Sequence, residues 1–146
     1  MMTEKSWDSL YEKYPDLFAN KDKTPMESCM SFGIECNIGW YDIISSVCYR
    51  IKQHEGNKKY HTERKLKEDP SYKSDYYPVT FDQIKEKYGG LRVYYSGGDD
   101  YVDGVIDMAE EMSYKTCERC GFPGSPNRQG WMMTLCDKCR GDLVKG

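Results

Sequence analysis

The sequence predicts an α+β protein in which a helical body with a small β-sheet carries a C-terminal zinc ribbon. Three observations support this class. Apolar residues recur at helical spacing in several segments, one short segment alternates apolar and polar residues as a strand does, and four cysteines form two Cys-x-x-Cys pairs. A chain of 146 residues is long enough for one domain with a small appended module. We expect residues 1–115 to form the body and residues 116–146 the ribbon.

Two helices are expected in the first half of the chain. The first is short and ends before Pro15. The second begins after a cap at Asn37 and ends near Gly56. Their apolar stripes are Trp7, Leu10, Tyr11 and Tyr14 in the first helix, and Trp40, Ile43, Ile44, Val47, Cys48 and Ile51 in the second. Because Cys48 lies on this stripe, we interpret it as a core residue and not as a nucleophile.

Residues 57–75 are expected to form a polar connection. They are rich in Lys and Arg and contain few aliphatic residues. Such a stretch is usually solvated or mobile, although a basic stretch can also contact phosphates.

The next segment, residues 80–88, carries the local signals of a helix. These signals are a capping-box pair at Thr80 and Gln83, staple positions at Val79 and Ile84, and a helix-ending Gly89. We therefore predict a third helix here.

A strand at residues 91–96 and a helix at about 101–114 complete the body. The helix has an apolar stripe of Val102, Val105, Ile106, Ala109 and Met112 and an N-terminal cap at Asp100. Alternation along the strand puts Arg92 and Tyr94 on the face opposite Leu91. A guanidinium group beside an aromatic ring can hold a nucleotide phosphate and base, so Arg92 and Tyr94 are candidate ligand-binding residues.

The four paired cysteines predict one structural Zn²⁺ ion. The spacing is Cys-x2-Cys-x15-Cys-x2-Cys, formed by Cys117, Cys120, Cys136 and Cys139. Two such pairs can face each other across a hairpin and supply four thiolates at about 2.3 Å from the ion. Four thiolates leave no open position for water, so the zinc is expected to stabilise the fold and not to catalyse a reaction.

The ribbon is basic while the body is acidic. Residues 116–146 contain five Lys or Arg and three acids, whereas residues 1–115 contain 16 Lys or Arg and 21 acids. The cations Arg119, Arg128, Lys138, Arg140 and Lys145 accompany Phe122 and Trp131. Cations beside aromatic rings are typical of nucleic-acid binding. The alternative is that the cations are ordinary surface residues and the aromatic rings fill the thin ribbon core.

Other candidate chemistry is weaker. Glycine pairs at 89–90 and 97–98 suggest a phosphate loop, but Asp99 and Asp100 would repel an anion there. Cys29, Cys36, His54 and His61 lack tight metal-ligand spacing, and a role for them stays open. We find no set of residues typical of an active site.

The chain contains no apolar run of the roughly 20 residues that cross a bilayer and no signal-peptide stretch at its beginning. We therefore expect a cytoplasmic protein. In that compartment paired cysteines favour a metal over disulfides.

Several segments resemble a family of small proteins from bacteriophages, prophages and some bacterial genomes. The residues that carry the resemblance are the run from Ile84 to Tyr95, Ala109-Glu110, Ser113, the first cysteine pair, Gly130-Trp131, Thr134-Leu135-Cys136 and Gly39-Trp40. It covers about residues 34–140. The resemblance implies a phage-type origin and a domain plan, but no activity.

We therefore expect a phage-type accessory protein, in the cytoplasm of a host bacterium, that acts non-enzymatically. Its expected partner is a host defence protein or a nucleotide signal. The alternative is a nucleic-acid-binding zinc-ribbon protein, and an enzyme acting on nucleotides is less favoured. The candidate contacts are Arg92, Tyr94, Arg119, Arg128, Trp131 and Arg140.

Overall fold

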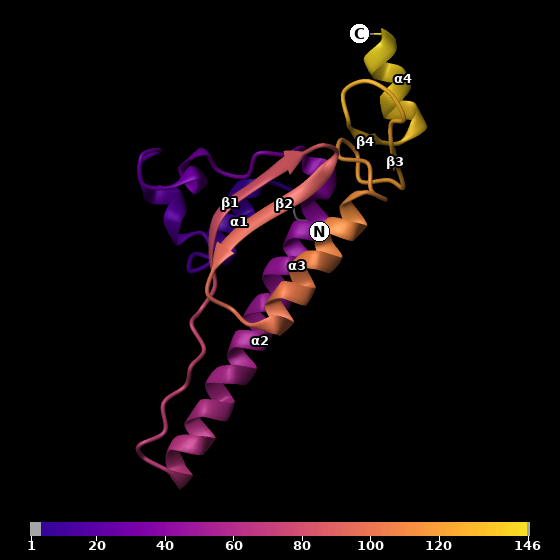
Figure 1. The fold of residues 1–146 in the computed structure, drawn as a ribbon. Helices are drawn as coiled ribbons and strands as arrows, with labels where there is room; N and C mark the ends of the chain where they lie inside the picture. The colour runs from indigo at the N-terminus through magenta and orange to yellow at the C-terminus, as the bar shows by residue number, and fades with distance from the viewer. Residues whose placement is uncertain (1–3, 146) are drawn as a thin grey trace.

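The computed structural model describes residues 4–145 and confirms the α+β class (Figure 1). Its described part has four α-helices and two antiparallel hairpins, with the four paired cysteines near the C-terminus. The α-helices are α1 (Trp7–Lys13), α2 (Tyr41–Glu68), α3 (Asp100–Ser113) and α4 (Asp137–Lys145). The strands are β1 (Thr80–Lys87), β2 (Gly90–Ser96), β3 (Ser125–Pro126) and β4 (Thr134–Leu135). Short 3₁₀ turns are η1 (Ala19–Asp22), η2 (Cys29–Phe32) and η3 (Ile38–Trp40).

One hydrophobic core joins the N-terminal segment, the first half of α2, the β1–β2 hairpin and α3. Its largest fully buried side chains include Leu10, Leu17, Met30, Trp40, Ile44, Ile51, Phe81, Ile84, Leu91 and Val102. The stripes predicted for the first helix, the second helix and the helix after the strand supply half of this set, namely Leu10, Trp40, Ile44, Ile51 and Val102. Cys48 is fully buried among them, as predicted.

The segment at residues 80–87 is a strand, so the helix predicted there is wrong. β1 pairs with β2 in an antiparallel register that sets Ile84 opposite Val93, with a bulge between Phe81 and Gln83. The bulge lets Phe81 and Ile84, three residues apart, both enter the core, and this spacing imitates a helix. Tertiary pairing therefore overrides the local capping signals.

The turn of this hairpin explains Gly89, which suggested a helix end. Tyr88 and Gly89 both have positive φ angles, 55° and 82°. Two consecutive residues of this kind are typical of a type I′ turn, whose twist matches that of the two strands. Leu17 and Glu35 form backbone hydrogen bonds to β1 from the N-terminal segment, so the outer edge of β1 is covered.

Helix α2 continues past Gly56 to Glu68, which corrects the polar connection predicted at 57–75. Lys, Arg, Glu and Gln are good helix formers, and one interior glycine costs only about 1 kcal/mol. This second half is mostly exposed and extends beyond the rest of the protein, and residues 69–79 run back from its end to β1 (Figure 1). Among the described residues, no helix has the length and apolarity needed to span a membrane.

Two helix N-caps in the structure also differ from the predicted ones. Asn37 precedes η3 without a side-chain hydrogen bond, and α2 starts only at Tyr41. Asp99, and not Asp100, caps α3, because its carboxylate accepts a hydrogen bond from the Val102 amide.

Candidate metal centre

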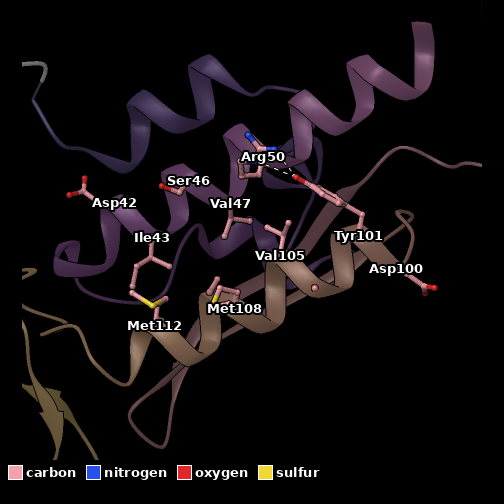
Figure 2. Close-up of a pocket in the computed structure, with 12 residues that line it drawn as sticks. Asp42, Ile43, Ser46, Val47, Arg50, Asp100, Tyr101, Val105, Met108 and Met112 are labelled. Carbon is pink, nitrogen blue, oxygen red and sulfur yellow. Dashed lines mark hydrogen bonds between the residues drawn. The ribbon is translucent and has the colours of Figure 1, made fainter. Parts of the chain in front are cut away.

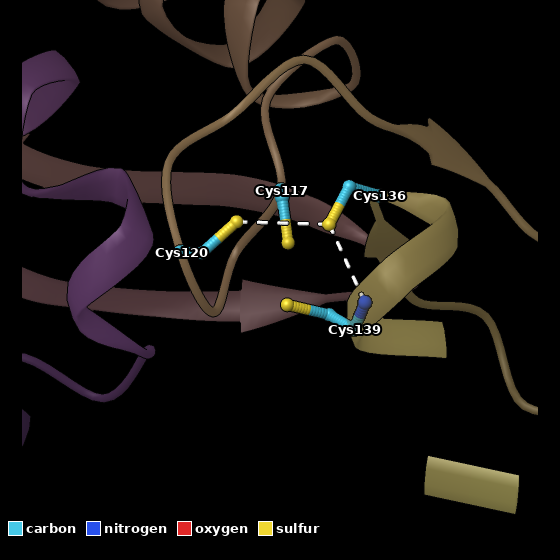
Figure 3. Close-up of side chains that lie close together, drawn as sticks. All are labelled: Cys117, Cys120, Cys136 and Cys139. Atoms are coloured by element: carbon cyan, nitrogen blue, oxygen red, sulfur yellow. Dashed lines mark hydrogen bonds between the residues drawn. The ribbon is translucent and has the colours of Figure 1, made fainter. Parts of the chain in front are cut away.

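The four cysteines of the two knuckles converge on one point (Figure 3). Cys117 and Cys120 lie in a tight turn after α3, Cys136 follows β4, and Cys139 is in the first turn of α4. All four Sγ atoms lie within 4.8 Å of one another. Gly121 takes a φ of 86° directly after the first pair, a conformation that favours glycine.

The donor set fits a metal ion such as zinc. A tetrahedral site with bonds of about 2.3 Å has sulfur–sulfur edges of roughly 3.8 Å. The Cys120 and Cys136 sulfurs are 3.6 Å apart, close to this edge and far longer than a disulfide bond. Both cysteines are free thiols.

Electrostatics inside the cluster favour a bound cation. Burial raises the pKa of the Cys117 thiol, but the backbone amides of Cys136, Cys120 and Arg119 lower it to about 6. The pKa of Cys139 is raised to about 12, first by its hydrogen bond with Cys136. Four neighbouring thiols therefore do not all ionise by themselves, whereas a divalent cation stabilises the thiolates.

The first knuckle is docked on the start of α2. The Gly39 amide donates to the Glu118 carbonyl over 2.7 Å, and the Asn37 amide donates to the Glu118 carboxylate over 2.9 Å. The buried Trp40 indole donates to the Thr116 carbonyl over 2.9 Å. These contacts give the Gly39-Trp40 pair a structural role that the sequence did not reveal.

The second knuckle is joined to the β1–β2 turn through Thr134. Its hydroxyl donates to the Gly89 carbonyl over 2.6 Å, and its own carbonyl accepts from the Glu118 amide over 3.0 Å. Thr134 is completely buried. The ribbon thus contacts both the helices and the sheet. A division of the chain at residue 115 stays a prediction.

The candidate ligand residues on β2 have different environments. Arg92 donates to the Tyr114 hydroxyl over 3.0 Å and lies 3.4 Å from the Glu110 carboxylate, which ties β2 to the end of α3. Tyr94 is 45% exposed. Ligand binding by this pair stays a prediction, and the structure gives Arg92 an intramolecular role.

The two ribbon aromatics do not fill its core. Trp131 is 81% exposed and Phe122 is 69% exposed, so the interpretation that they pack inside is wrong. The small ribbon core instead consists of Cys117, Leu135 and Cys139, with Met133 and Cys136 packed against it. Three buried or half-buried cysteines, Cys117, Cys136 and Cys139, replace aromatic rings as the packing centre of the ribbon, while Cys120 is exposed.

The loop that presents Trp131 is organised by Asn127. Its amide group donates to the carbonyls of Gln129 and Trp131, and its oxygen accepts from the Met133 amide over 2.7 Å. An exposed tryptophan is thereby held on an ordered turn. Of the predicted cationic contacts, Arg140 donates to the Ser125 carbonyl, while Arg119 and Arg128 are exposed.

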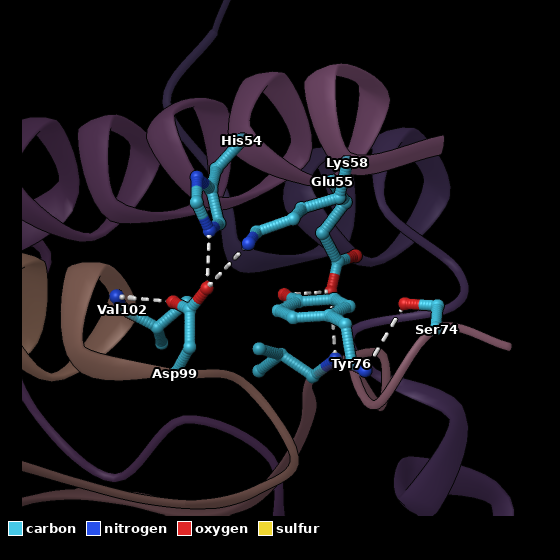
Figure 4. Close-up of polar contacts among 8 residues, drawn as sticks. His54, Glu55, Lys58, Ser74, Tyr76, Asp99 and Val102 are labelled. Atoms are coloured by element: carbon cyan, nitrogen blue, oxygen red, sulfur yellow. Dashed lines mark hydrogen bonds and ion pairs between the residues drawn. The ribbon is translucent and has the colours of Figure 1, made fainter. Parts of the chain in front are cut away.

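A polar cluster on α2, which the sequence did not predict, holds two other segments in place (Figure 4). His54 contacts the Asp99 carboxylate over 2.8 Å, and Lys58 lies 3.7 Å from the same carboxylate. Glu55 accepts from the Tyr76 hydroxyl over 2.7 Å and from the Val79 amide. The cluster attaches the α3 N-terminus and residues 74–79 to α2.

Burial raises the pKa of Asp99, but the hydrogen bond from His54 and the nearby cations outweigh it and lower the pKa overall. His54 is thus engaged in the fold. Among the described residues, Cys117, Cys120, Cys136 and Cys139 are the one group of three or more side chains positioned to share a metal.

Comparison of the chain with models of protein families, with curated proteins and with solved structures finds no match. The bacteriophage relationship therefore stays an expectation from the sequence.

Proposed function

We propose that this chain is a non-enzymatic binding protein whose ribbon folds around one structural zinc ion. Cys117, Cys120, Cys136 and Cys139 would hold the ion, and their close sulfurs support this assignment. When bound, zinc supplies roughly 10–16 kcal/mol of binding free energy to a short segment with a very small core. All four ligand positions are thiolates, so the ion serves the fold of the ribbon.

The exposed Trp131 is the observation that carries the binding role. A large aromatic ring loses much apolar surface to water when a partner covers it, and tryptophan is enriched among residues that dominate binding energy. Asn127 fixes the loop beforehand, which lowers the entropy cost of association. The proposed partner is a host protein or a nucleotide-type signal, in keeping with a phage accessory protein.

A second candidate function is nucleic-acid binding by the ribbon. Arg119, Arg128 and Lys138 are exposed and belong to the same basic segment as Trp131. The acidic body opposes broad affinity for a polyanion, so any such binding would be confined to the ribbon. This candidate predicts retention on single-stranded nucleic acid that falls steeply with salt.

Paired variants test the ribbon surface. The wild type, Trp131→Ala and Tyr77→Ala are used as baits in a host lysate, and the captured protein or nucleotide is identified and its Kd measured. Tyr77 is 75% exposed and lies outside the ribbon, so Tyr77→Ala is the matched control. We expect Trp131→Ala to weaken binding at least about tenfold with an unchanged melting temperature. Equal affinity of Trp131→Ala and wild type would refute the ribbon as the binding surface, and turnover of a captured nucleotide would indicate an enzyme.

A further inference from the structure

An open apolar groove runs between α2 and α3 and includes none of the four metal-site cysteines (Figure 2). The two helices lie side by side and antiparallel, and the groove has a volume of about 650 Å³. Its lining residues are Asp42, Ile43, Ser46, Val47, Arg50, Asp100, Tyr101, Gly104, Val105, Met108, Ala109 and Met112. The groove is therefore long, shallow and bounded by two helices.

The floor and the α3 ridge of the groove are apolar although they face solvent. Met108 is 62% exposed and Met112 is 44% exposed, while Ile43 and Val105 are partly buried against the core. Methionine side chains are flexible and polarisable, and they are common on surfaces that accept apolar partners. Val105, Met108 and Met112 thus extend the apolar stripe of α3 from the edge of the core into the groove.

The solvent side of this ridge is negative. Residues 100–115 contain five acids and one cation, Lys115, which pairs with Glu111. Glu110 and Asp103 face β2, where they contact Arg92 and Tyr95, so Asp100, Asp107 and Glu111 are the acids on the groove side. Helical geometry places Asp107 and Glu111 on the solvent side of Met108. The one cation in the groove lining, Arg50, hydrogen-bonds to the Tyr101 hydroxyl at one end.

We infer that this groove docks a cationic amphipathic helix from a partner protein. The 14 residues of α3 span about 21 Å, so an incoming helix of similar length would complete a three-helix bundle with α2 and α3. Its apolar stripe, repeating at i, i+3, i+4 and i+7, would cover the methionines. Its Lys or Arg residues would face the acids of α3.

A second copy of this chain is a poorer occupant. Pairing of the same face in two copies brings the α3 acids against each other, which is unfavourable. The exposed second half of α2 cannot supply an apolar stripe either, because Tyr60 and Leu66, six residues apart, point to different sides of the helix. Charge complementarity therefore selects a basic partner segment. This inference does not rest on the binding role proposed for the ribbon or for Trp131.

A displayed library of 18-residue helical peptides tests the inference directly. The apolar positions vary among Leu, Ile, Met, Phe and Ala, and the other positions vary among Lys, Arg, Glu, Asp and Gln. The library is selected on the wild-type protein, and Kd values of the enriched peptides are measured by fluorescence anisotropy. We expect enriched peptides to be net positive, to keep the apolar spacing and to bind more weakly at higher salt.

Two methionine variants provide the matched comparison. Met108→Lys places a cation in the groove, whereas Met26→Lys adds the same charge at a residue that is 96% exposed and outside the groove. We expect at least a tenfold loss of peptide affinity for Met108→Lys and less than a twofold change for Met26→Lys. Trp131→Ala should also leave peptide affinity within about twofold. A failure of the groove inference can therefore be distinguished from a failure of the proposed function of the ribbon.

Three results would overturn the inference. One is the absence of enriched peptides, or enrichment of acidic or unpatterned ones. Another is an equal effect of the two methionine variants, which would mean that only net charge matters. The last is a concentration-dependent dimer in sedimentation equilibrium that Met108→Lys abolishes, because the occupant would then be a second copy.

Discussion

Substitution of Gly39 by alanine should detach the first metal knuckle from the body. A Cβ atom at this position would lie less than 3.0 Å from the carbonyl oxygens of Cys117 and Glu118, closer than real Cβ atoms come. Both contacts are with backbone atoms, which cannot rotate away as a flexible side chain does. Gly39 does not have a positive φ, so backbone conformation does not contribute to the effect. The knuckle must shift, and the hydrogen bonds that hold it must lengthen.

The size of the effect follows from the three hydrogen bonds at this junction. The amides of Asn37 and Gly39 donate to Glu118, and the Trp40 indole donates to the Thr116 carbonyl. A hydrogen bond contributes about 1 kcal/mol net, and a buried donor left without a partner costs more. The expected loss is therefore about 3 kcal/mol, which corresponds to a fall in melting temperature of about 10 °C for a chain of this length.

Urea and thermal unfolding in the presence of zinc measure this loss, with Gly56→Ala as the control. A Cβ at Gly56 would meet nothing within 4 Å, and this glycine lies inside α2, so alanine should stabilise the protein by about 1 kcal/mol. Zinc content should stay at one ion per chain in Gly39→Ala, because all four cysteines remain. If Gly39→Ala unfolds at the same urea concentration as the wild type, the docking described above does not contribute to stability.

Three further predictions concern the cysteines and the polar cluster. Cys136→Ser should lose the metal and destabilise the ribbon, as measured by metal analysis and thermal unfolding. Cys29 is exposed and outside the cluster, so Cys29→Ser should keep the metal and the stability of the wild type. Metal retained by Cys136→Ser would contradict the site. Asp99→Asn should lower stability by about 1 kcal/mol at neutral pH. Against the effect of burial, contact with His54 lowers the Asp99 pKa below 3.8. The stability that the ionised Asp99 contributes to the wild type should therefore be lost as pH falls below that value. In urea unfolding measured as a function of pH, Asp99→Asn should not show this loss. Cys48, whose burial raises its pKa to about 12, should resist alkylation in the native protein and react only after unfolding, and rapid native labelling would show that the core opens.

The sequence predicted the features that depend on short spacings. The two cysteine pairs carry their own geometry, because two intervening residues suffice to bring both thiols to one ion. The helices α1 and α3 and the first half of α2 follow from apolar periodicity, because one face of each packs on the core. These elements required no knowledge of the rest of the fold.

The errors arise where distant residues decide the structure. The helix predicted at residues 80–88 is wrong because the bulge at Phe81 gives β1 the apolar spacing of a helix, and only pairing with β2 reveals the strand. The second half of α2 lacks an apolar face, so periodicity could not identify it. The contact of His54 with Asp99 joins residues 45 positions apart, and the exposure of Trp131 depends on the loop held by Asn127.

The docked knuckle has a mechanical consequence for the helix pair. α3 leads directly into the first knuckle, and the knuckle is bound to the residues that precede α2, so the ribbon bridges the C-terminal end of one helix and the N-terminal end of the other. Ile43 and Met112 lie at this same end of the groove. A metal ion held by the four cysteines would therefore keep the two helices together at this end. Release of the ion is expected to change the width of the groove there, while the contact of His54 with Asp99 keeps the other end closed.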